Sequence, residues 1–117
     1  MTRRVWLRLD DIQQALADID RLLHGMTMEE AAQRREVIAA YERFLEIVSE
    51  ASRHIPTSLK DDFTELPWRR IADLGNVLRH AYHRIDLRIL WEIYELDIPK
   101  LRPAIDQMKA RSEPKDG

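Results

Sequence analysis

The sequence predicts an all-α protein, an antiparallel four-helix up-and-down bundle. Apolar residues recur at helical spacing through most of the 117 residues, and no stretch of useful length alternates apolar and polar residues as a strand would. Glycines and prolines, which end helices, fall mainly between these apolar runs. Short connections favour antiparallel neighbours in such a bundle. We therefore expect one domain over residues 1–110 and a frayed tail over residues 111–117.

The first helix is predicted from a capping pattern and an apolar stripe. Asp10 is followed three residues later by Gln13, a spacing that resembles a capping box at a helix start. Gly25 lies where a left-handed residue is expected to end the helix. Between them, apolar residues recur at helical spacing at Ile12, Leu16, Ile19 and Leu23.

The second helix has a clearer start, because Thr27 and Glu30 form another capping box. Its apolar residues are spaced by four and three residues in turn: Val37, Tyr41, Phe44, Val48, Ala51 and Ile55. Such a heptad seam indicates a long helix that packs lengthwise against a partner at a shallow angle. Pro56 is expected to end this helix.

The remaining elements follow a loop predicted over residues 56–66, which is rich in turn-forming residues. Pro67 is well placed as a first helical residue, and the third helix is predicted to run from about Trp68 to His80 or beyond. Its buried stripe would consist of Ile71, Leu74 and Leu78. The last helix begins near Asp86, and its prolines predict a kink or break near Asp97–Pro99.

Composition excludes several classes of protein. The chain has no cysteine, which excludes a disulfide framework and a thiolate zinc site. The longest uninterrupted apolar run, Val37 to Tyr41, is too short for a membrane span or a signal-peptide core, so we expect a cytoplasmic protein. The net charge of −2 argues against strong attraction of the whole chain to nucleic acid. Between Pro67 and Leu90, however, five arginines stand against two aspartates.

The stretch from Gly75 to Asp86 concentrates the chemistry of the sequence. It gathers, within eight positions, the side chains of Asn76, Arg79, His80, Tyr82 and His83. An α-helix turns about 100° per residue, so Asp73, Asn76, His80 and His83 are predicted to share one polar face of the third helix. This face lies opposite the apolar stripe of the same helix. Asn76 is one turn before His80 and could orient its imidazole. Arg79 points about 100° away from His80, and Tyr82 about 200° away, so the helix must end near His80 for Tyr82 to join it.

The residues alone leave three interpretations of this cluster open. The first is metal-independent RNA cleavage, with His80 as general base or acid, an arginine stabilising charge on the phosphate and the RNA 2′-hydroxyl as nucleophile. The second is a metal site that uses His80 and His83 with Asp86 or Asp73, which is weak because only two histidines are present. The third is an ordinary polar helix end.

The C-terminal half of the chain, from Pro67 to about Leu101, resembles the HepT family of HEPN-domain proteins. These are toxins encoded beside a minimal nucleotidyltransferase, MntA. The resemblance rests on Pro67-Trp68-Arg69, Asn76, Leu78, His80, Tyr82, Ile85-Asp86-Leu87, Trp91-Glu92 and Pro99. It implies a HEPN-like bundle, a homodimer with a composite ribonuclease site at its interface, an RNA substrate and no cofactor or metal. It also implies that the partner nucleotidyltransferase transfers AMP to Tyr82.

The chain departs from the family signature, Arg-x4-His-x-Tyr, at one position, where Gly75 replaces the arginine. Arg79 could fold back into the vacated space, or reach across the dimer, and substitute for it. Alternatively, Gly75 permits close helix packing, and the chain is a weak or inactive HEPN-like binding subunit of a nucleotidyltransferase complex. The candidate catalytic residues are therefore His80, Arg79 and Asn76, with Tyr82 as the AMP acceptor and His83 and Gly75 as accessory positions.

Overall fold

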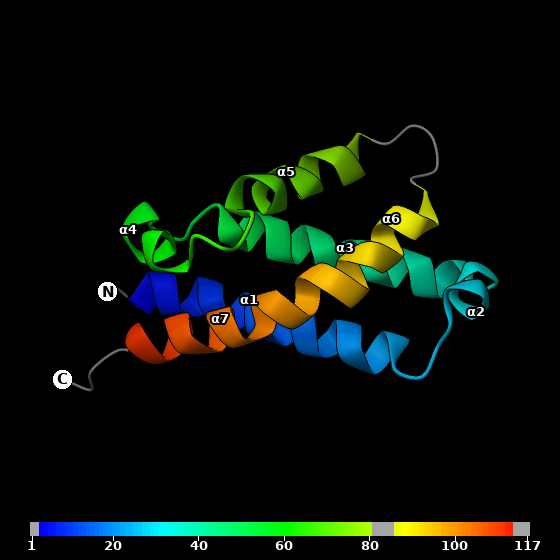
Figure 1. The fold of residues 1–117 in the computed structure, drawn as a ribbon, viewed down its shortest axis with the longest axis horizontal. Coiled ribbons are helices and arrows are strands. Elements are labelled where there is room, and N and C mark those ends of the chain that lie inside the picture. The colour runs from blue at the N-terminus through cyan, green and yellow to red at the C-terminus, as the bar shows by residue number, and fades with distance from the viewer. Residues whose placement is uncertain (1–2, 81–85, 114–117) are drawn as a thin grey trace.

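The computed structural model describes residues 3–80 and 86–113, and within these ranges every regular element is a helix. The long elements are α1 (Arg3–Leu23), α3 (Arg35–Ser52), α5 (Trp68–Arg79) and a final run of α6 (Leu87–Glu92), η2 (Ile93–Asp97) and α7 (Ile98–Arg111). In Figure 1, α3 runs back along α1, α5 lies on α3, and α7 lies along α1. The all-α bundle predicted from the sequence is confirmed.

Helix α1 begins at Arg3, two turns before the predicted start, so the predicted capping box at Asp10 is wrong. The buried side chains of Val5 and Leu9 extend the apolar stripe toward the N-terminus, which keeps these turns helical. Asp10 instead accepts a hydrogen bond from Lys109 Nζ at 2.7 Å, and the Gln13 amide donates to Asp106 at 2.8 Å. These side chains therefore tie α1 to α7.

The end of α1 and the next helix start agree with the sequence. Gly25 has the positive φ of 75° expected of a left-handed C-cap. The Thr27 hydroxyl accepts from the Glu30 N–H at 3.1 Å, and the Glu30 carboxylate accepts from the Thr27 N–H at 3.0 Å. The predicted capping box is therefore confirmed.

The helix that this box starts is much shorter than predicted. It is α2 (Met28–Ala32), and an extended Arg34 separates it from α3, which ends at Ser52 rather than near Pro56. Residues 32–36 are all exposed, so no burial holds a continuous helix across the junction. The seam itself is largely buried in α3, with Phe44 only half-buried.

The loop predicted over residues 56–66 contains helix α4 (Thr57–Lys60) and a 3₁₀ turn, η1 (Asp61–Phe63). Its apolar side chains Leu59, Phe63 and Leu66 are buried, and this burial explains the ordered turns. Beside them, Arg111 pairs with Asp62 at 3.2 Å and its guanidinium lies 5.1 Å from the Phe63 ring centroid. Helix α7 runs to Arg111, and the buried Ser112 is its C-cap. The predicted fraying stays a prediction, because residues 114–117 lie outside the described residues.

The last helical run begins and bends where the sequence predicted. The Asp86 carboxylate caps α6 by accepting the Arg88 N–H at 2.9 Å, and this backbone hydrogen bond, with a weaker one from the Arg88 side chain, lowers the pKa of Asp86. Residues Ile93–Asp97 form a π-helical turn rather than a break. Pro99 lacks an N–H donor in the first turn of α7, and the widened turn just before it accommodates the missing hydrogen bond. Pro103 lies inside α7, beyond that turn.

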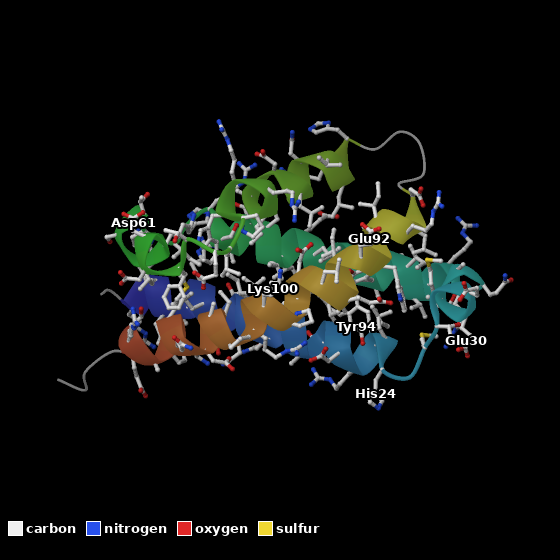
Figure 2. The ribbon with its side chains drawn as sticks, in the orientation of Figure 1. His24, Glu30, Asp61, Glu92, Tyr94 and Lys100 are labelled. Carbon is white, nitrogen blue, oxygen red and sulfur yellow. The ribbon has the colours of Figure 1, made fainter. Side chains whose placement is uncertain are left out.

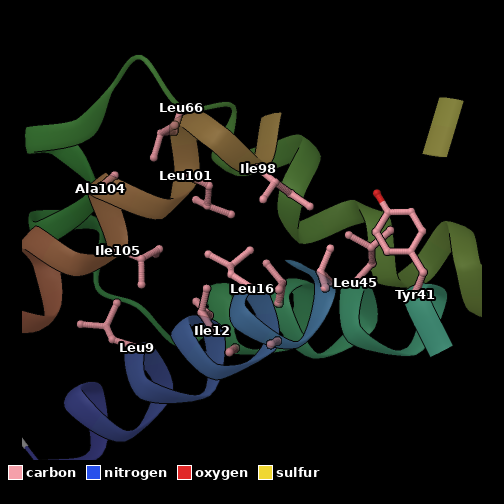
Figure 3. Close-up of a cluster of buried hydrophobic side chains, with 14 of the residues drawn as sticks. Leu9, Ile12, Leu16, Tyr41, Leu45, Leu66, Ile98, Leu101, Ala104 and Ile105 are labelled. Atoms are coloured by element: carbon pink, nitrogen blue, oxygen red, sulfur yellow. The ribbon is translucent and has the colours of Figure 1, made fainter. Parts of the chain in front are cut away.

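The core lies where α1, α3 and α7 meet. Figure 3 shows side chains from these helices converging, including Leu16, Leu45, Leu101 and Ile105. Tyr41 is fully buried, and its hydroxyl donates to the Leu90 carbonyl at 2.6 Å, which joins α3 to α6. Across the parts of the chain that the structure describes, none of the helices combines the length and apolar character needed to cross a membrane.

Candidate functional site

The start of α5 is fixed to the preceding turn, and this anchor positions the whole helix. The Trp68 indole N–H donates to the Phe63 carbonyl at 3.0 Å, and the Lys60 ammonium lies 5.5 Å from the centroid of the Trp68 ring. Helix α5 then runs to Arg79, and His80 is its C-cap. The predicted third helix is confirmed in type and extent, except that Pro67, predicted as its first helical residue, is its non-helical N-cap.

The described candidate residues lie at the C-terminal end of α5. Asn76, Arg79 and His80 are all exposed. The His80 backbone N–H donates to the Asn76 carbonyl at 3.1 Å. Tyr82 and His83 fall within residues 81–85, outside the described residues, so their predicted roles stay predictions.

The helical projection agrees with the structure of α5. Asp73, Asn76 and His80 are exposed on one side. Ile71, Leu74 and Leu78 are half-buried on the other side, packed against the core. Between the described side chains of Asn76 and His80 there is no hydrogen bond, so orientation of the imidazole by Asn76 also stays a prediction.

Gly75 is the buried residue of α5, and it lies against Ser49 of α3. The Ser49 hydroxyl accepts from the Gly75 N–H at 2.9 Å and donates to the Ala72 carbonyl at 2.9 Å. A Cβ on residue 75 would lie 2.8 Å from Ser49 Oγ and 3.2 Å from Ser49 Cβ. Close packing of α5 on α3 therefore depends on glycine at this position.

Arg79 folds back toward the same place. Its Nη1 atom lies 3.4 Å from where a Cβ on residue 75 would be. Arg79 lines a cleft of about 280 Å³ between α1, α3 and α5, together with the basic residues Arg8 and Arg43 and the acidic residues Asp11, Glu46 and Glu50. Both physical effects considered for Gly75, close packing and room for Arg79, thus occur together.

Replacement of Gly75 by alanine is expected to lower the free energy of unfolding by about 1 kcal/mol, because overpacking against Ser49 outweighs the gain in helix propensity. Urea denaturation of Gly75→Ala measures this change. Gln107→Ala, at an exposed position of α7 away from this cleft, is the matched control and should change stability little. A Gly75→Ala variant more stable than the wild type would contradict the close contact.

An apolar groove of about 370 Å³ separates α5 from the last helical run, and sequence reasoning did not predict it. Leu74 of α5 lines one side, and Ile89 and Leu96 line the other. Ile89 and Leu96 are more than half exposed, as is Val77 on α5. An ion pair between Arg70 and Asp97, at 3.3 Å, joins the two sides.

The metal interpretation of the cluster gains no support from the described residues. Among them, no group of three or more histidine, cysteine, aspartate or glutamate side chains is placed to hold a metal ion. That interpretation also requires His83, which lies outside the described ranges.

The all-α helix order, with an exposed histidine at the end of α5, agrees with the HEPN-like bundle expected from the sequence. The chain belongs to the Ribonuclease HepT-like family, whose family model matches residues 12–108. It is 34% identical over 101 residues to "Probable ribonuclease HepT" of Thermococcus cleftensis, covering 86% of this chain and 92% of that protein.

A second relative is named "Putative RNase MJ1380" and comes from Methanocaldococcus jannaschii. It is 32% identical over 98 residues, covering 84% of this chain and 90% of that protein. No solved structure matches this chain with statistical significance. The family resemblance predicted from the C-terminal half is confirmed, and it extends over most of the chain.

Proposed function

We propose that this chain is an RNA endonuclease and the toxin of a toxin–antitoxin pair. The observation that carries the proposal is the Ribonuclease HepT-like match over residues 12–108, which spans α5 and includes the exposed His80. An exposed imidazole beside a helix end is accessible to a large polyanion such as RNA. The direct test is cleavage of RNA by the purified chain in buffer that contains a metal chelator.

The proposed reaction uses the RNA itself as the nucleophile. The 2′-hydroxyl attacks the adjacent phosphorus, the bond to the 5′ oxygen breaks, and the products end in a 2′,3′-cyclic phosphate and a 5′-hydroxyl. His80 takes the proton from the 2′-hydroxyl or supplies one to the leaving oxygen. A guanidinium stabilises the charge that develops on the phosphate oxygens. This chemistry needs no metal and no cofactor.

We further propose that the active form is a homodimer. The apolar groove and the exposed Val77, Ile89 and Leu96 support this, because large apolar side chains in one region are typical of protein interfaces. Arg79 folds toward α3, whereas His80 is exposed at the end of α5. A site shared between two protomers would allow arginine and histidine to approach one phosphate from opposite sides.

The proposed antitoxin is a minimal nucleotidyltransferase that transfers AMP from ATP to Tyr82. A bulky, negatively charged adenylate two residues from His80 would block the site and repel RNA phosphate. After incubation with the partner and ATP, mass spectrometry should find the added adenylate on the peptide that contains Tyr82, and Tyr82→Phe should abolish it. Modification of the half-buried Tyr94 instead, or of no tyrosine, would contradict this assignment.

Gly75 favours a second candidate function, a catalytically weak or inactive HEPN-like helical subunit that binds a nucleotidyltransferase. The position of the family arginine is occupied by a packing contact with Ser49, which supplies no charge. This candidate predicts a stable complex with the nucleotidyltransferase and no cleavage of RNA. Growth arrest on expression, abolished by His80→Ala, would favour the toxin over this candidate.

A further inference from the structure

Three arginines along one edge of α5 form no ion pair among the described residues: Arg53, Arg69 and Arg79. Arg79 shares a cleft with Asp11, Glu46 and Glu50 of α1 and α3 but pairs with none of them. Arg69 lies in the first turn of α5, and Arg79 is its last residue. Arg53 follows α3, and its Nε donates to the Ala72 carbonyl at 3.1 Å, which fixes this guanidinium beside the middle of α5. The three cations are therefore spread along the length of the helix.

These cations share an edge with the candidate catalytic residues. At 3.6 residues per turn, positions 69, 72, 76, 79 and 80 fall within an arc of about 100°. From Arg69 to His80 the helix rises about 16 Å. In Figure 2, nitrogen-bearing side chains project into solvent from the outer side of α5. Arg69, Asn76 and His80 are all exposed, so a long ligand could contact them together.

We infer that this arginine edge, formed by Arg53, Arg69 and Arg79, binds successive phosphates of a single-stranded RNA whose scissile bond lies at His80. The inference rests on the proposed function, because it concerns the same RNA. Guanidinium groups bind phosphate oxygens through paired N–H donors. A flexible single strand can follow a straight row of cations, and a chain with net charge −2 needs such a local concentration to hold RNA.

Asp73 borders the arginine edge and supplies an internal check on it. It is exposed, and it has no ion-pair partner among the described residues. Its carboxylate would repel a phosphate strand bound along the edge. Removal of this charge should therefore tighten RNA binding, the opposite of the effect of removing Arg69.

The experiment measures RNA binding by fluorescence anisotropy at several salt concentrations, in a His80→Ala background that prevents cleavage. The probe is a labelled single-stranded oligonucleotide, with the duplex of the same sequence for comparison. We expect Arg69→Ala to reduce the salt slope of log K by about 0.7, the contribution of one phosphate contact on a single strand. Arg69→Lys should retain the slope, and Asp73→Asn should tighten binding.

The matched control is Arg35→Ala, because Arg35 is exposed and also lacks a carboxylate partner among the described residues, but belongs to the first turn of α3. It should leave the slope unchanged. The effect of Arg69→Ala should also fall as the oligonucleotide is shortened until it no longer reaches Arg69. Preference for the duplex, or equal slopes for Arg69→Ala and Arg35→Ala, would overturn the inference.

Failure of the inference can be told from failure of the proposed function. If the wild-type chain cleaves RNA but binding does not depend on Arg69, the arginine edge is wrong and the proposed function stands. If the wild-type chain neither cleaves nor binds RNA, the proposed function fails and the inference fails with it.

Discussion

Replacement of His80 by alanine is expected to slow RNA cleavage by about 10² to 10⁴-fold, the usual contribution of a general acid or base. Among the described residues at the exposed end of α5, the imidazole is the side chain of the kind that most often serves as a general acid or base. Cleavage of a labelled RNA under single-turnover conditions measures the chemical step directly.

Two other histidines provide matched controls for this prediction. His24 and His54 are both exposed and belong to other elements: His24 follows α1, and His54 follows α3, where it lies 3.3 Å from the Glu50 carboxylate. Alanine at either position should leave the cleavage rate unchanged, and all three variants should unfold at similar urea concentrations. A His80→Ala protein that cleaves as fast as the wild type would exclude His80 from the reaction.

Replacement of Arg79 by alanine is expected to slow cleavage by about 10² to 10³-fold, as loss of one preorganised donor to a developing oxyanion does. Its guanidinium is the cation nearest the position of the missing family arginine, since Nη1 lies 3.4 Å from a Cβ placed on residue 75. Single-turnover cleavage is again the measurement, with kcat and KM separated under steady-state conditions.

Arg43→Ala is the control for Arg79, because Arg43 lines the same cleft but lies 3.7 Å from Glu46. It should retain most of the activity. Arg79→Lys should recover only part of the rate, since an ammonium keeps the charge but loses the paired donors. Equal activity of Arg79→Ala and wild type would show that Arg79 does not replace the arginine, whereas an inactive wild type would favour the binding subunit.

Local sequence signals predicted those parts of the fold that depend on neighbouring residues. The Thr27 capping box, the left-handed Gly25 and the Asp86 start of α6 were all correct. The capping box predicted at Asp10 was wrong because the same Asp-x-x-Gln spacing also occurs inside a helix. There, Asp10 and Gln13 form their hydrogen bonds with side chains of α7 instead. The break at Gln33–Arg34 contains neither glycine nor proline, so no local signal marked it.

The sequence predicted those features of the candidate site that lie within the single helix α5, but not its contacts with other helices. Periodicity correctly separated the exposed Asn76 and His80 from the apolar stripe of α5. The contact between Gly75 and Ser49 joins residues 26 positions apart, and the apolar groove lies between α5 and the last helical run. Both features depend on how helices pack against one another, and the spacing of apolar residues within one helix does not predict this.

The contact between Ser49 and Gly75 also constrains how this chain could change over time. An arginine introduced at position 75 would meet Ser49 Oγ at 2.8 Å and displace the hydrogen bonds that this hydroxyl makes with α5. A single substitution to the family arginine would therefore weaken the packing of α5 on α3 while it adds a charge. A smaller residue at position 49 would relieve this contact, so the effect of an arginine at position 75 depends on which residue occupies position 49.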